Sequence, residues 1–144
     1  MIRLPYDWDI QETYSDTLYG IIASNNLEAR NNPEKFQLIS VTGYQTEDSL
    51  ITYFKNELRT LKKDKNMKVL DAGQIGFEEE KTYWVRFESL ESEHTIMNIV
   101  KYIKPEKRNE IYLIQSAVYK TDDFMERLCF LKRLVDSFEL VIEN

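Results

Sequence analysis

The stretch from Lys81 to Phe138 constrains the fold most, because three strand-like patterns stand there in a row before one helix-like pattern. Lys81–Ser89 alternates between apolar and polar residues, which is the period of two that a strand imposes. His94–Lys104 and Glu110–Lys120 are rich in β-branched and aromatic residues, which fit a pleated surface. The connectors between these segments are too short for a crossover, so the sequence predicts an antiparallel meander.

A helix is predicted to follow this meander. Thr121–Asp123 places capping oxygens and negative charge where a helix begins. Apolar residues then recur at spacings of four and three, which puts them on one helix face. These residues are Phe124, Leu128, Leu131, Val135 and Phe138. Asp123 and Arg127 stand four residues apart and are expected to form an exposed ion pair, worth about 0.3–0.5 kcal/mol.

The N-terminal part of the chain predicts further strands and a second helix. Strand-like patterns cover Trp8–Thr13, Leu18–Ser24 and Lys35–Gly43, and the polar segment Asn25–Glu34 is expected to be a loop. Trp8 is expected to pack under the proline turn at Pro5–Asp7. Thr46–Asp48 is predicted to cap a helix whose inward face carries Ile51, Phe54, Leu58 and Leu61.

A return strand, Met67–Phe77, is predicted between this helix and the meander, with Gly73 and Gly76 marking a bend or bulge. Taken together, the elements predict an α+β fold. Both faces of the central strands carry apolar residues, so the specific expectation is an α-β-α sandwich: a mostly antiparallel sheet with one helix on each face. The expected core consists of Phe54, Leu58, Val85, Ile99, Ile114, Leu128, Leu131 and Val135.

Two short motifs resemble a known family. Leu4–Pro5–Tyr6–Asp7–Trp8 resembles the aliphatic–Pro–x–x–Trp opening of the PsbP-like superfamily, and Val135–Asp136–Ser137–Phe138 resembles the Ser–Phe end of its last helix. The resemblance implies that residues 1–144 form a single PsbP-like α+β domain used for binding rather than catalysis. Members include an extrinsic subunit of photosystem II, a Ran-binding import factor and bacterial lipoproteins. No site residue of the family can be carried over, because no site motif matches.

Composition excludes several classes of function. The net charge of −6 disfavours nucleic acid as a partner, since a phosphate backbone would be repelled. No stretch reaches the ~20 apolar residues of a membrane-spanning helix. The compartment stays open: the cytoplasm, or an exported or membrane-anchored location with a peripheral tether supplied by a removed leader.

Residues able to support catalysis are few and scattered. His94 is the single histidine and Cys129 the single cysteine, which is expected to be a buried apolar filler. Acidic residues cluster at Asp7–Asp16 and at Glu78–Glu80 without the spacing of a calcium loop. We therefore expect neither a metal nor a cofactor nor a catalytic residue. A small enzyme built around His94 and the acidic clusters is the alternative.

The best candidates for binding lie on the second face of the Lys81–Ser89 strand. Trp84 and Arg86 alternate with the core-facing residues, and a large aromatic beside an arginine is typical of binding hot spots. Trp84 either belongs to a second core or faces a groove. A basic segment, consisting of Lys101, Lys104, Lys107 and Arg108, is interpreted as a charged rim that discourages edge pairing, with a phosphate or anionic-lipid contact as the alternative. The sequence thus predicts a non-catalytic binding or assembly module with a protein partner.

Overall fold

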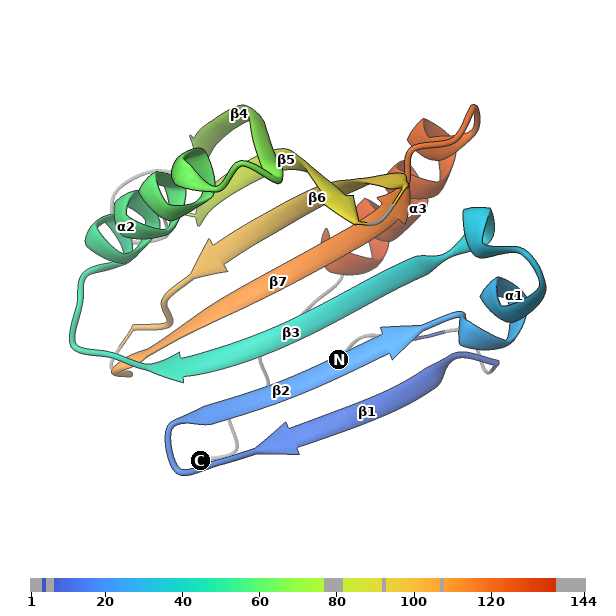
Figure 1. The fold of residues 1–144 in the computed structure, drawn as a ribbon. Helices are drawn as coiled ribbons and strands as arrows, with labels where there is room; N and C mark the ends of the chain where they lie inside the picture. The colour runs from blue at the N-terminus through green and yellow to red at the C-terminus, as the bar shows by residue number, and fades with distance from the viewer. Residues whose placement is uncertain (1–3, 5–6, 77–81, 92, 107, 137–144) are drawn as a thin grey trace.

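An antiparallel sheet dominates the computed structural model, which describes residues 4, 7–76, 82–91, 93–106 and 108–136. Within these residues seven strands follow the order β1-β2-β3-β7-β6-β5-β4, and three helices flank them (Figure 1). The strands are β1 (Asp9–Tyr14), β2 (Leu18–Ser24), β3 (Gln37–Gln45), β4 (Met67–Ile75), β5 (Thr82–Glu91), β6 (His94–Ile103) and β7 (Glu110–Tyr119). The helices are α1 (Asn26–Asn31), α2 (Leu50–Lys63) and α3 (Phe124–Asp136).

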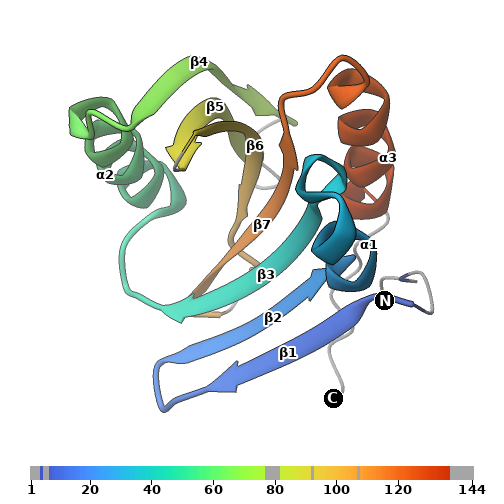
Figure 2. The same ribbon diagram turned by 45° about the vertical axis from the view of Figure 1, so that its right-hand side comes forward.

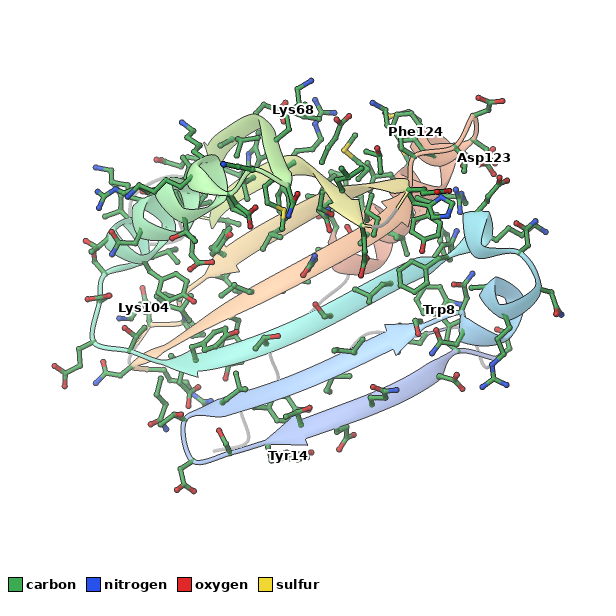
Figure 3. The ribbon with its side chains drawn as sticks, in the orientation of Figure 1. Trp8, Tyr14, Lys68, Lys104, Asp123 and Phe124 are labelled. Atoms are coloured by element: carbon green, nitrogen blue, oxygen red, sulfur yellow. The ribbon has the colours of Figure 1, made fainter. Side chains whose placement is uncertain are left out.

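The predicted meander is confirmed, because β5 pairs antiparallel with β6 and β6 pairs antiparallel with β7. The N-terminal strands join it through an antiparallel pair of β3 and β7. The sheet is open, with β1 at one edge and β4 at the other. Figure 3 shows Tyr14 near the end of the β1 edge, far from the α3 start that Asp123 and Phe124 mark.

The two long helices lie apart from each other along the sheet, with α2 beside β4 and α3 beside β7 and β3 (Figure 2). Phe54 of α2 lies in a cluster with Tyr83, Val85 and Phe87, which point to one face of β5. Leu128 and Leu131 of α3 pack with Met97 and Val118, which point to the other face. Trp8 is buried in this second cluster, while Pro5 and Tyr6 of the expected turn lie outside the described residues. Each of the two helices thus contributes apolar side chains to its own buried cluster.

The described residues therefore form a mixed α and β fold with a seven-stranded, open antiparallel sheet and three helices. Contacts of α2 are concentrated on β4, β5 and β6, toward one end of the strand order. Six of the eight expected core residues are buried, and Leu58 and Ile99 are partly buried against the clusters. Phe138, the last expected helix position, lies outside the described residues.

The expected loop at Asn25–Glu34 is wrong, because the structure has helix α1 there, followed by a 3₁₀ turn at Pro33–Lys35. Asn25 explains the difference. Its side chain is buried, donates to the Lys35 carbonyl at 2.7 Å and accepts from the Gln37 amide at 2.7 Å. The Asn25 side chain thus joins the start and the end of the segment between β2 and β3, which the polar sequence of that segment did not indicate.

The predicted start of α2 also needs correction. The capping residue is Ser49, whose hydroxyl accepts from the Thr52 amide at 3.3 Å, whereas the predicted cap began at Thr46. The inward face shifts accordingly, so Leu50 and Tyr53 join the cluster while Ile51 is 42% exposed. Thr46 and Ser49 are both residue types that cap helices, and in the structure Ser49 holds the cap position.

Candidate functional site

The site begins with a β-bulge at Leu70. Val69 is paired with Phe87 and Asp71 with Arg86, so Leu70 is the extra residue in β4. Because side chains alternate along a strand, one inserted residue sends those that follow to the other face. Asp71, Gly73 and Ile75 therefore share the face of Trp84 and Arg86.

Gly73 and Gly76 were expected to mark a bend or bulge, and the structure has the bulge at Leu70 and a bend at Gly76. Gly73 is regularly paired with Trp84, and Gly76, with φ of 90°, makes the bend after the strand. Gly73 has a packing role instead. A Cβ atom added there would lie 2.8 Å from Cζ2 and 2.9 Å from Cε2 of Trp84. The absent side chain lets the indole lie against the β4 backbone.

Replacing Gly73 by alanine is expected to displace the Trp84 indole and to lower the free energy of unfolding by about 1–3 kcal/mol, the usual cost of overpacking. Urea unfolding and the emission of Trp84 in a Trp8→Phe background measure both effects. Gly20→Ala is the matched control, because the nearest atoms to its added Cβ lie at an ordinary 3.9 Å. Equal losses for the two alanines would contradict the packing role of Gly73.

Arg86 and Asp71 form a two-pronged ion pair at the side of this face. Arg86 Nε donates to Asp71 Oδ1 at 2.9 Å, and its Nη2 donates to Oδ2 at 3.0 Å. The two side chains are 35% and 43% exposed, so the pair is in contact with solvent and contributes little to stability. Its main effect is to hold the guanidinium in one orientation beside Trp84.

A groove of about 470 Å³ lies between strands β4–β6 and helix α3. Its volume falls in the ~300–1,000 Å³ range of ligand pockets. Apolar side chains make up half of the lining: Ile75, Trp84, Ile99, Met125 and Leu128. The remaining lining residues are Asp71, Arg86, Lys101, Cys129 and Lys132. The structure thus brings the two predicted contacts, Trp84 and Arg86, into one cavity.

Helix α3 supplies the opposite wall of the groove. Met125, Cys129 and Lys132 follow one another at spacings of four and three, which places them on one helix face. Cys129 is exposed, so the expectation of a buried cysteine was wrong. The inward positions belong to Leu128 and Leu131, and Cys129 is rotated away from them by the helical turn.

Two lysines share one carboxylate at the groove. Lys101 forms an ion pair with Asp136 Oδ1, and Lys132 Nζ donates to Asp136 Oδ2 at 2.7 Å. The Lys101 side chain is only 16% exposed. Burial, and then the charge of Lys132, lowers the pKa of Lys101. The two positive charges of Lys101 and Lys132 therefore share the one negative charge of Asp136.

The expected basic rim is divided in the structure. Lys101 lines the groove. Lys104 Nζ donates to the Asp48 carbonyl oxygen at 2.7 Å, and Arg108 Nη1 lies 3.3 Å from Glu110 Oε2. Lys107 lies outside the described residues. These cations therefore serve separate contacts rather than one patch.

The described residues that were considered for catalysis lie in separate parts of the fold. His94 is exposed and stacks on Tyr119 with ring centroids 4.9 Å apart. Asp9 and Glu12 lie on β1, four strands from the strand that His94 begins. In the part of the chain that the structure describes, no group of three or more His, Cys, Asp or Glu residues could hold a metal ion. Glu78–Glu80 lies outside that part.

Another large cavity among the described residues has a polar lining. About 510 Å³ of space is lined by polar and charged residues: Thr17, Gln45, Thr46, Glu47, Arg108, Asn109 and Glu110. An apolar lining with a few polar groups is the usual composition of a ligand site, and the groove beside Trp84 fits it.

Comparison with known proteins identifies the fold. No protein family model matches the sequence, and no curated protein sequence matches it. A similar solved structure is PA94 from Pseudomonas aeruginosa, a protein of unknown function, with a TM-score of 0.62 and 8% identity over 98% of this chain and 88% of that one. LpqN, involved in cell envelope biogenesis of Mycobacterium tuberculosis, has a TM-score of 0.60 and 12% identity over 96% and 80%. Identities this low show a shared fold alone.

Among the described residues, no helix is both long enough and apolar enough to span a membrane. The longest, α2, has 14 residues and contributes its apolar face to the sheet.

Proposed function

We propose that this chain is a non-catalytic binding module that holds the apolar part of a partner in the groove between β4–β6 and α3. One observation carries the proposal: a partly buried tryptophan, an oriented arginine and the apolar wall of α3 line a single cavity of ligand size. Trp84 and Arg86 are the proposed contacts. Tryptophan and arginine at one site are the residue types on which binding energy concentrates.

The setting of this module is also a proposal. The fold is shared with LpqN, whose described role is in cell envelope biogenesis. Together with the resemblance to the PsbP-like superfamily, this supports a single α-β-α domain working at a cell envelope, exported or tethered there. A protein partner is compatible with the groove if it presents apolar side chains, and so is a small amphiphile.

The groove can be tested with 1-anilinonaphthalene-8-sulfonate, a dye whose emission rises in apolar surroundings. In a Trp8→Phe variant, Trp84 is the single tryptophan. We expect saturable binding of one dye per chain, with energy transfer from Trp84 to the dye. The proximity of Trp84 to the groove makes this transfer specific to the site.

A pair of α3 variants separates the groove from other apolar surface. Cys129→Phe places a ring in the groove, while Glu126→Phe places the same ring on the same helix at an exposed position that does not line it. We expect the first variant to abolish energy transfer and the second to retain it. Equal dye binding by both variants, with unchanged unfolding curves, would refute the proposed site.

A further inference from the structure

We infer that the groove binds an anionic amphiphile with a single apolar chain, the class to which fatty-acid carboxylates belong. The inference rests on the proposed function and deepens it. The apolar chain would lie along Trp84, Ile99 and Leu128, and the anionic head would lie between Lys101 and Lys132.

The charge balance of the groove points to an anion. Three cations and one carboxylate line it, and Asp136 adds a second carboxylate beside Lys101 and Lys132. Because Arg86 is paired with Asp71, the unmatched positive charge belongs to the two lysines. Among the described residues the groove lining is therefore net positive, whereas the chain as a whole carries a net charge of −6. Local complementarity of this kind selects and steers an anionic ligand.

The geometry of the lysines suits a head group at the mouth of the groove. Each oxygen of Asp136 already accepts from one lysine, so each ammonium keeps donors for a second acceptor. Lys132 is 54% exposed and Lys101 is 16% exposed, which gives one solvent-facing and one inward-facing cation. A carboxylate placed between them would receive charge-assisted hydrogen bonds from both sides.

The apolar residues lie next to these lysines. Lys101 is the cross-strand neighbour of Trp84, and Ile99 is the neighbour of Arg86 on the same pair of strands. The Lys101 ammonium stem therefore lies directly beside the Trp84 indole, and Ile99 follows two residues away on the same face of β6. The groove volume of about 470 Å³ suits one small ligand, whereas a docked protein surface is flatter and broader.

The test uses three probes with the same chain at concentrations below micelle formation: dodecanoate, dodecanol and dodecyltrimethylammonium. Binding is followed by the emission of Trp84 in the Trp8→Phe chain. We expect dodecanoate to bind at least tenfold more tightly than the alcohol, and the cation to bind most weakly. The order follows from the head group alone, because the apolar chain is constant.

Lysine variants assign the preference to the head-group site. Lys132→Gln removes the more exposed cation and leaves Asp136 paired with Lys101, so the fold is not expected to change. Lys63→Gln on α2 changes the net charge equally at an exposed position away from the groove. We expect about a tenfold loss of dodecanoate affinity in the first variant, unchanged dodecanol binding, and no effect of the second.

The outcomes are distinguishable. Equal affinity for dodecanoate and dodecanol, insensitive to Lys132→Gln, would overturn the anionic head group but leave an apolar binding groove. No effect of any probe on Trp84, together with absent dye binding, would overturn the proposed function as well. Binding to anionic vesicles that depends on Lys132, without binding of free dodecanoate, would assign the groove to a membrane surface and overturn the inference.

Discussion

Truncation of Leu131 to alanine is expected to lower the free energy of unfolding by about 2–5 kcal/mol, the range for a large side chain removed from a packed core. Leu131 is fully buried, at 0% exposure, in a cluster with Leu128, Met97 and Val118. Its loss would leave a cavity between α3 and the sheet. Urea unfolding followed by circular dichroism measures the change.

Phe130→Ala is the control for this prediction. Phe130 is the neighbouring residue on α3, yet 36% of it is exposed, so removing its ring is expected to cost less than Leu131→Ala in spite of its larger size. A loss below about 0.5 kcal/mol for Leu131→Ala would show that the inward face of α3 is assigned incorrectly. The assignment matters for function, because the same helix forms the wall of the groove.

Replacing Arg127 by methionine is expected to lower the free energy of unfolding by about 2–4 kcal/mol, because several hydrogen bonds donated by one charged guanidinium are lost together. The expected exposed ion pair was only half right. Asp123 is 63% exposed, but Arg127 is 11% exposed. Its guanidinium donates to the Glu34 carbonyl at 2.7 Å and to the Tyr119 carbonyl at 3.1 Å. It thereby joins the start of α3 to the end of β7 and to the 3₁₀ turn.

Methionine retains an apolar stem like that of arginine but lacks the guanidinium, so the substitution mainly removes the polar contacts. Arg133→Met is the control, since Arg133 is exposed on the same helix and its loss is expected to change little. Arg127→Lys should fall between, because one ammonium cannot replace a planar fork with several donors. Thermal and urea unfolding of the three variants measure the free energies of unfolding. Equal losses for Arg127→Met and Arg133→Met would contradict the proposed role of Arg127 in joining α3 to β7 and the 3₁₀ turn.

The sequence determined the parts of this fold that depend on local periodicity. Alternation along β5 set which of its residues face α2, and spacings of four and three set the inward face of α3. Short connectors predicted the antiparallel order of β5, β6 and β7. Each of these follows from geometry repeated within a few residues, so no distant contact was needed. The same alternation placed Trp84 and Arg86 together on the second face of β5.

Tertiary structure decided what lies opposite them. Leu70 is an ordinary strand residue, so nothing local marked it as the bulge that turns Asp71 toward Arg86. The spacing of Met125, Cys129 and Lys132 is visible along α3, but it does not say which strands that helix faces. Lys101 and Asp136 are 35 residues apart and meet only because α3 packs across β6. A groove assembled from segments so distant in the chain is set by burial of both sheet faces, and a local pattern cannot encode it.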